Sequence, residues 1–179
     1  MKNSFYVSVM TVMALGLATN ASAVDGTITF EGVVNDTTCT LDTNSQNMSV
    51  LLPSITSTDF TGANTAASSS AVKFTLSATG CDVGAVSASV LFATGGNVDS
   101  TNGNLNNSFA GGTDAQIRIY KADGTTPINL ANYGESASNK GNIVSGNTTI
   151  DFYANYFSKN AKPTAGVLKT SIQYSMQYL

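Results

Sequence analysis

The sequence predicts an all-β protein folded as a sandwich. Apolar residues alternate with polar or small ones along several short runs, and no long segment has the 3.6-residue period of an amphipathic helix. Turn-forming residues separate the runs, as they do between short strands of a sandwich. Charged residues make up only 11% of the chain, so Ser, Thr and Asn must supply the polar surface, which suits an exported β-protein.

The first 23 residues have the three parts of a secretory signal peptide. Lys2 supplies the positive charge, residues 5–18 are mostly apolar, and Ala21 and Ala23 frame a cleavage site of the A-x-A type. The alternative is a transmembrane anchor, but a span needs about 20 apolar residues, and this stretch is shorter and interrupted. We therefore expect export and a mature chain that begins near Val24.

Composition argues against nucleic-acid binding and against catalysis. Removing residues 1–23 leaves 156 of the 179 residues, and the loss of Lys2 takes the formal charge from −3 to −4. The remaining basic residues are scattered singly and form no stripe that could neutralise phosphates. The absence of histidine rules out Ser-His-Asp and Cys-His arrangements, and no close carboxylate pair indicates a glycosidase. We expect no catalytic residue, cofactor, metal or small-molecule substrate.

The two cysteines, Cys39 and Cys81, both lie in the part that remains after export. An oxidising compartment favours one disulfide between them. Closing that loop lowers the conformational entropy of the unfolded chain, which stabilises the folded protein by about 4 kcal/mol. Two unpaired buried thiols are the alternative. A zinc site lacks donors, because the chain has no histidine and no third cysteine.

Alternation predicts which residues of each run share one face of a sheet. The Asp123-Gly124 dipeptide between two such runs predicts a hairpin turn. The Gly- and Asn-rich stretch 95–112 and the polar stretch 134–149 are expected to be long surface loops. No repeat or shift of composition marks a second domain. In chain order, the same-face sets are Gly26, Ile28, Phe30, Gly32 and Val34; Val72, Phe74, Leu76 and Ala78; Val86, Ala88, Val90 and Phe92; Ile117 and Ile119; Ile128 and Leu130; Ile150, Phe152, Ala154 and Tyr156; and Leu168, Thr170, Ile172, Tyr174, Met176 and Tyr178.

The two ends of the mature chain are unusual. The last strand-like run finishes on Tyr178 and Leu179, and the first begins at the expected cleavage site. Chain termini are normally frayed. Because strand-like runs extend to both ends of the mature chain, we expect that both terminal strands are used in the function of the protein.

Three segments in order resemble the pilin subunits of chaperone–usher fimbriae, close in type to the major subunits of type 1-like pili. The first is residues 26–39, GTITFEGVVNDTTC, and the second is the spacing of the two cysteines. The third is FYANY at 152–156, followed after Pro163 by AGVLKTSIQYSMQYL at 165–179. This last segment has a penultimate tyrosine and a glycine fourteen residues from the end, with alternating apolar residues between them. The resemblance covers essentially the whole mature chain.

The resemblance implies an incomplete immunoglobulin-like β-sandwich that lacks its final strand and is completed by a donor strand from a neighbouring subunit. It divides the chain into a signal peptide (1–23), an N-terminal donor-strand extension (24–34) and a pilin domain (35–179). The implied partners are identical or related pilin subunits, a periplasmic chaperone and the outer-membrane usher. The implied location is an extracellular fimbrium on the cell surface, reached through the periplasm. Both shaft and minor-adaptor roles fit the pattern.

The resemblance also assigns roles to residues at both ends. The acceptor groove and the chaperone-recognition strand would contain the C-terminal residues, with the Leu179 carboxylate as chaperone anchor. The donor strand would consist of Val24, Gly26, Ile28, Phe30, Gly32 and Val34. The acceptor and recognition residues would be Gly166, Leu168, Ile172, Tyr174, Met176, Tyr178 and Leu179.

A single-domain fimbrial adhesin that binds a host glycan or protein is the alternative function. The mature length leaves no room for an additional lectin domain of the kind that tip adhesins in this family carry. A sugar would then have to contact exposed aromatic residues of the pilin domain itself. The candidates are Phe109, Tyr120 and Tyr133.

Overall fold

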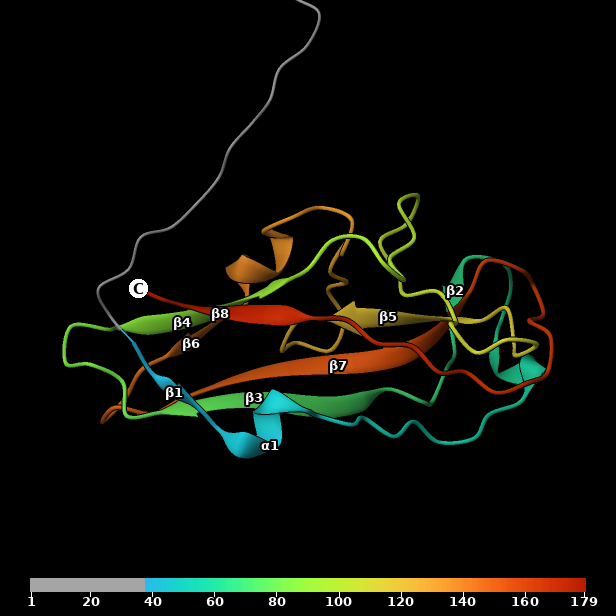
Figure 1. The fold of residues 1–179 in the computed structure, drawn as a ribbon. Coiled ribbons are helices and arrows are strands. Elements are labelled where there is room, and N and C mark those ends of the chain that lie inside the picture. Colours follow the sequence, from blue (N-terminus) through green and yellow to red (C-terminus); the bar gives the residue numbers. More distant parts are fainter. Residues whose placement is uncertain (1–37) are drawn as a thin grey trace, which may run out of the picture. The chain divides into compact units, whose positions relative to one another are not determined.

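The computed structural model describes residues 38–179, which form two antiparallel sheets packed face to face (Figure 1). The expected signal peptide (1–23) and donor extension (24–34) lie outside the described residues. The elements are β1 (Thr40–Leu41), α1 (Thr43–Gln46), the 3₁₀ helix η1 (Ser57–Asp59), β2 (Thr65–Ala66), β3 (Val72–Thr79), β4 (Ser87–Phe92), β5 (Gln116–Tyr120), the 3₁₀ helix η2 (Glu135–Ser138), β6 (Lys140–Asn142), β7 (Thr148–Ser158) and β8 (Tyr174–Tyr178).

The larger sheet is built around β7, which has eleven residues. β3 pairs with its first part, from Ala78 opposite Thr148 to Val72 opposite Ala154. β5 pairs with its second part, and β2 pairs with its last residues. β1 pairs with the end of β3. One long strand therefore pairs with three shorter ones, and β1 joins the sheet through β3.

The smaller sheet contains β6, β4 and β8 in that order. β8 runs antiparallel to β4, with Tyr178 opposite Ala88 and Tyr174 opposite Phe92. β6 pairs with the start of β4 on its other side. Within residues 38–179, β8 is thus an edge strand.

The core lies between the two sheets and confirms most of the expected alternation. Phe152 is at its centre: its ring stacks on Phe74 at 5.4 Å between centroids and meets Phe92 edge-on at 5.3 Å. Both arrangements are ones that aromatic pairs prefer. The buried apolar residues that form one contiguous cluster are Leu76, Ala88, Val90, Phe92, Leu105, Ile117, Ile119, Ile128, Leu130, Ile150, Phe152 and Ala154.

The stretch 95–112 is only in part the surface loop that its composition predicts. Asn104 is 1% exposed and Leu105 is 3% exposed. Leu105 exchanges two backbone hydrogen bonds with Ile117, which add it to the edge of β5. The expectation was wrong for these residues because Gly and Asn indicate turns without indicating what lies between them.

The stretch 134–149 is also more ordered than expected, since it contains η2 and β6. η2 packs on β4, where the Ser136 hydroxyl donates to the Val90 carbonyl at 2.7 Å. The expectation that Val86 shares the buried face of β4 was wrong. Val86 precedes the strand, and its side chain is 69% exposed.

The turn after β5 forms at Asp123-Gly124, as the dipeptide predicts. Gly124 has a φ of 68°, in the left-handed region that favours glycine. The Asp123 carboxylate accepts from the backbone N–H groups of Thr125 at 2.8 Å and Thr126 at 2.7 Å. Hydrogen bonds from Thr126 and Thr125 lower the Asp123 pKa to about 2. The second arm forms a single bridge, Tyr120 to Pro127, instead of a full strand.

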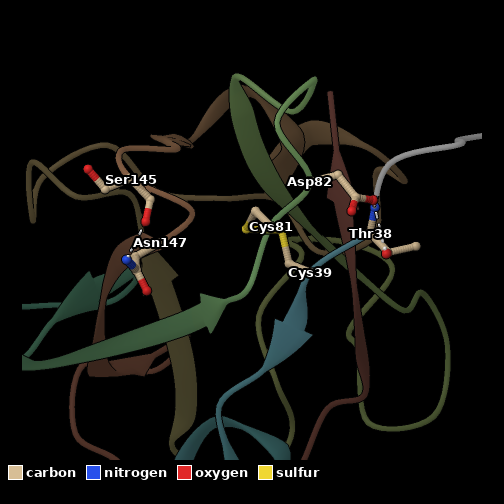
Figure 2. Close-up of a disulfide and its surroundings, with 6 residues drawn as sticks. All are labelled: Thr38, Cys39, Cys81, Asp82, Ser145 and Asn147. Atoms are coloured by element: carbon tan, nitrogen blue, oxygen red, sulfur yellow. Dashed lines mark hydrogen bonds between the residues drawn. A yellow bond between two sulfur atoms is a disulfide. The ribbon is translucent and has the colours of Figure 1, made fainter.

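The expected disulfide between Cys39 and Cys81 is present. It links the start of β1 to the residues that follow β3, and Figure 2 shows it beside Thr38 and Asp82. The Thr38 N–H donates to the Asp82 carboxylate at 2.8 Å, and the Asp82 N–H donates to the Thr38 carbonyl at 3.1 Å. The disulfide and these two bonds hold the start of β1 against the residues that follow β3.

Replacing both cysteines, Cys39→Ser with Cys81→Ser, should lower the free energy of unfolding by about 4 kcal/mol, because the unfolded chain regains the freedom of a long loop. Urea unfolding of the purified protein measures this loss. Asp82→Ala, which removes only the two exposed hydrogen bonds that Thr38 donates to the Asp82 carboxylate, is the matched control and should cost about 1 kcal/mol. Equal urea midpoints for the double variant and the unchanged protein would contradict the prediction.

Candidate strand-acceptor edge

The C-terminal strand is hydrogen-bonded through its odd-numbered residues. Leu179 exchanges two backbone bonds with Ser87, at 2.8 and 2.9 Å, and the Ala93 N–H donates to the Gln173 carbonyl at 2.9 Å. In an antiparallel pair, hydrogen-bonded and non-hydrogen-bonded residues alternate. The backbone groups of the even-numbered residues of β8 therefore point away from β4.

The same alternation continues before β8, where no regular strand is formed. The Lys169 carbonyl accepts from the Ser108 N–H at 2.8 Å, and the Val167 carbonyl accepts from the Thr113 N–H at 3.2 Å. The Ser171 carbonyl accepts from a side-chain amide. Residues 167–179 thus form one extended segment, bonded along a single edge for its whole length, which runs across the sandwich in red in Figure 1.

The even-numbered side chains of this segment face the core but are only half-buried. They pack against the buried cluster, and Tyr174 meets Phe92 edge-on at 6.5 Å. The Thr170 hydroxyl is buried and finds no hydrogen-bond partner within the described part of the chain. Most of the odd-numbered side chains are exposed. The half-buried set comprises Leu168, Thr170, Ile172, Tyr174, Met176 and Tyr178, which includes every acceptor residue expected from the sequence between Leu168 and Tyr178.

A second segment with the same character follows α1 and was not anticipated from the sequence. Met48, Val50 and Leu52 pack against the core and are half-buried, whereas Leu51 is 89% exposed. Within residues 38–179, the backbone of residues 48–55 makes no hydrogen bond to another backbone group. Every second residue from Met48 to Leu52 is apolar, which is the pattern of a strand with one buried face. Leu51 hides this alternation, because it makes residues 50–52 a continuous apolar run.

Tyr174 connects the two half-covered segments. Its hydroxyl donates to the backbone carbonyl of Ser45, which belongs to α1 immediately before the second segment. The Ser45 hydroxyl in turn accepts from the Ser77 N–H of β3 at 2.9 Å. Burial, with a smaller contribution from Tyr178, raises the pKa of Tyr174. The tyrosine is therefore neutral and able to donate at neutral pH.

The loop that holds the first half of the C-terminal segment is fixed by a buried polar network. Gln116 donates to the Asp99 carboxylate at 2.8 Å and accepts from Asn104 at 3.2 Å. Lys159 forms an ion pair with Asp99 and lowers the pKa of that carboxyl well below its usual range. Arg118 donates to Asn104 at 2.9 Å. Because its polar groups are paired, this stretch can lie under the surface without a large desolvation penalty.

Gly166 lies where the C-terminal segment begins, and its role is explained by packing. A Cβ at this position would lie 2.7 Å from the Thr113 nitrogen and 2.8 Å from the Gly112 carbonyl carbon. A Cβ on Gly112 would lie 2.1 Å from the Val167 carbonyl oxygen. The two glycines thus permit a backbone contact that no other residue allows. A role of Gly166 in chaperone recognition stays a prediction.

Leu179 extends the ladder beyond β8. Its carbonyl oxygen accepts from the backbone N–H groups of Val86 at 2.7 Å and Ser87 at 2.9 Å. The side chain is 43% exposed. Its use as a chaperone anchor is likewise still a prediction.

The three aromatic residues of the adhesin alternative do not form a common site. Tyr120 is 9% exposed, so its face is not available to a sugar, whereas Phe109 is 48% exposed and Tyr133 is 52% exposed. A shallow pocket of about 130 Å³ lies near β5 and contains none of them. Its lining residues are Asn102, Arg118, Pro127, Ile128, Asn129 and Glu135.

The described residues contain neither a metal-binding cluster nor a helix that could span a membrane. No cluster of three or more metal-binding side chains of the His, Cys, Asp or Glu type is found among them. None of their helices has the length and apolar character needed to cross a bilayer.

Comparison with known proteins gives a consistent result. The family described as "Fimbrial protein" matches residues 28–178. The chain is 35% identical to the S-fimbrial protein subunit SfaA of Escherichia coli O6:K15:H31 over 181 residues, which cover 96% of each chain. It is 32% identical to the F17 fimbrial protein of Escherichia coli over 180 residues, which cover 95% of this chain and 96% of the relative.

A solved structure of a chaperone–usher pilus has a subunit with the same fold. The TM-score is 0.59 at 18% sequence identity, and the match covers 90% of this chain and 100% of that one. The fold is therefore the incomplete immunoglobulin-like sandwich that the resemblance to pilins implies.

Gly166→Ala should destabilise the isolated subunit by about 1–3 kcal/mol, the usual cost of forcing extra atoms into a packed site. Thermal or urea unfolding without any chaperone measures the effect. Gly62→Ala is the matched control, since a Cβ at Gly62 meets nothing within 4 Å, and it should leave stability nearly unchanged. Equal stability of the two variants would show that Gly166 is not required for packing.

Proposed function

The chain belongs to the fimbrial protein family and is a structural subunit of a pilus, and we propose that its half-covered core binds a β-strand donated by a neighbouring subunit. The observation that carries this proposal is the segment 167–179. Its even-numbered residues combine backbone groups that point away from β4 with side chains that lie on the core. An added strand would form hydrogen bonds with these backbone groups, and these side chains would cover one of its faces.

The segment containing Met48, Val50 and Leu52 supplies the other wall of the proposed site. It lies on the same core cluster and has no ladder partner among residues 38–179. A strand inserted between the two segments would complete both edges at once. Such a strand needs one apolar face and one polar face, because its outer side remains in contact with solvent.

Residues 24–34 have the pattern that this site requires. Ile28, Phe30 and Val34 share one face with two glycines, while the opposite face is mainly polar. Burying each of these side chains is worth about 1.5–3 kcal/mol, so three of them contribute roughly 5–9 kcal/mol. Ordering the strand offsets part of that gain, and ladder hydrogen bonds add to it. We assign the donor strand to Val24, Gly26, Ile28, Phe30, Gly32 and Val34.

An exposed strand edge beside an apolar core is an aggregation hazard before assembly. This supports a periplasmic chaperone that covers the edge temporarily and an outer-membrane usher at which the donor strand replaces it. The proposed route is export by the signal peptide 1–23, passage through the periplasm, and incorporation into an extracellular fimbrium. The proposed role is structural and involves no catalysis.

Strand donation predicts opposite effects for two changes at the ends of the chain. Deleting residues 24–31 should leave a subunit that binds chaperone but cannot be added to a growing fibre. Appending a copy of residues 24–35 after Leu179, through a flexible Gly/Ser linker, should fill the site within one chain and give a soluble monomer. That monomer should melt far above the deleted subunit, because its apolar donor face is buried.

Phe30→Asp in the appended copy is the matched control and should abolish most of the gain in melting temperature, because a buried unpaired carboxylate is costly. Calorimetry of the two appended forms and electron microscopy of the deletion strain provide the measurements. Fibres formed by the deleted subunit, or equal melting temperatures for the two appended forms, would show that the subunits are joined in another way.

Neighbouring residues of β8 should differ in their effect on strand capture. Met176 is half-buried on the core side, whereas Ser175 is exposed on the opposite face. Met176→Asp should therefore strongly reduce the amount of chaperone that co-purifies with the subunit, and Ser175→Asp should not. Similar losses for both variants would indicate that the chaperone does not bind along the core-facing side of this strand.

A further inference from the structure

Arg118 in β5 is the single arginine of the chain, and two contacts hold its guanidinium in place. The guanidinium carbon lies 3.8 Å from the centroid of the Phe157 ring. The Nε–H donates to the Asn104 side chain at 2.9 Å. Both supporting residues are buried, whereas Arg118 itself is half-buried. A planar guanidinium that is stacked on one side and bonded at Nε keeps a fixed orientation.

The positive charge of Arg118 has no carboxylate partner among the described residues. The two ion pairs found there join Lys73 to Asp151 and Lys159 to Asp99. A guanidinium has five N–H donors, and within the described part of the chain only the Nε–H of Arg118 has an acceptor. Partial burial of a cation costs free energy that an anion can offset. The terminal nitrogens of Arg118 are therefore available for the two parallel bonds that arginine forms with a carboxylate.

Arg118 also lines the shallow pocket of about 130 Å³ near β5, and a second free donor lines it too. The Asn129 side-chain oxygen accepts from the Ala131 N–H at 3.0 Å, while its NH₂ group finds no acceptor within residues 38–179. Sites that enclose a whole small ligand usually measure about 300–1,000 Å³. This pocket can therefore enclose only one end of a ligand.

Glu135 in the same pocket restricts which carboxylates fit. One of its oxygens accepts from the Asn129 N–H at 3.1 Å, and the other accepts from the Asn132 side chain at 3.2 Å. These bonds tie Glu135 to the turn, and it forms no ion pair with Arg118. An ionised carboxylate only accepts hydrogen bonds, and it repels a second negative charge. A ligand with one carboxylate for Arg118 and a hydroxyl donor for Glu135 would satisfy both side chains.

We propose that this pocket binds the acidic end of a hydroxylated monocarboxylic acid, the chemistry of a uronic acid residue in a glycan. Arg118 would bind the carboxylate, with Asn129 as an additional donor, and Glu135 would accept from a neighbouring hydroxyl group. None of the lining residues belongs to the segments 48–55 or 167–179. The site therefore goes beyond strand donation and does not depend on it.

The test uses the fact that one arginine gives one Nε–H signal in the NMR spectrum of the isotope-labelled, purified subunit. Titration with glucuronate at constant ionic strength should shift this signal and reach saturation, with half-saturation on the order of millimolar because the pocket is shallow. Glucose has hydroxyls but no carboxylate and should leave the signal unchanged. Acetate has a carboxylate but no hydroxyl and should need about tenfold higher concentration.

Two variants examine the assigned residues, with binding followed on the ligand's own NMR signals. Arg118→Lys keeps the charge but removes the fork, and it should weaken glucuronate binding about tenfold. Glu135→Gln removes the repulsion without removing the pocket, so it should strengthen acetate binding several-fold and reduce the preference for glucuronate. Lys140→Gln is the matched control, because Lys140 is exposed on β6 outside the pocket, and it should change neither affinity.

Each contrary result overturns a defined part of the proposal. An Arg118 signal that does not move with glucuronate, or that moves equally with glucose, would exclude a carboxylate site. Equal affinity for acetate and glucuronate would overturn the assignment to a hydroxylated acid. A shift of the Arg118 signal caused by Glu135→Gln without ligand, combined with no binding by either protein, would show that Glu135 is itself the partner of Arg118. All of these results leave strand donation untouched.

Discussion

The whole arrangement depends on how the backbone of residues 167–179 is hydrogen-bonded. Odd-numbered residues are paired to β4 and to the loop that precedes β5, and the even-numbered residues from Leu168 to Met176 point their backbone groups the other way. Unpaired backbone groups are tolerated in water but not when they are buried. Because the side chains of those same residues lie on the core, a strand added at this edge, as we propose, would pair with those backbone groups.

Several features hold this edge in place without completing it. The disulfide fixes the start of β1 to the end of β3, and Tyr174 ties β8 to α1. Gly112 and Gly166 allow a close backbone contact at the other end of the segment. The polar network around Asp99 and Gln116 keeps the supporting loop ordered. The domain thus keeps the proposed acceptor segment ordered before a partner binds, which lowers the entropy cost of binding.

The sequence predicted the parts of the fold that depend on strict alternation. β3, β7 and the even-numbered residues of the C-terminal segment were identified because each has polar or small residues between its apolar ones. The segment with Met48 and Val50 was missed because Leu51 interrupts the pattern, and its strand-like role depends on packing against the core. The burial of Asn104 could not be predicted, because it depends on hydrogen bonds with the side chains of Gln116 and Arg118 in β5.

Residue-resolved hydrogen exchange tests the central claim most directly, because it compares adjacent amides of one strand. In the subunit without residues 24–31, the amides of Ser175 and Gln177 should be protected, while those of Tyr174 and Met176 exchange fast. In the form with the appended donor strand, all four should be protected. Equal protection of neighbouring amides in the deleted subunit, or no gain at Tyr174 and Met176 on addition of the strand, would contradict the account.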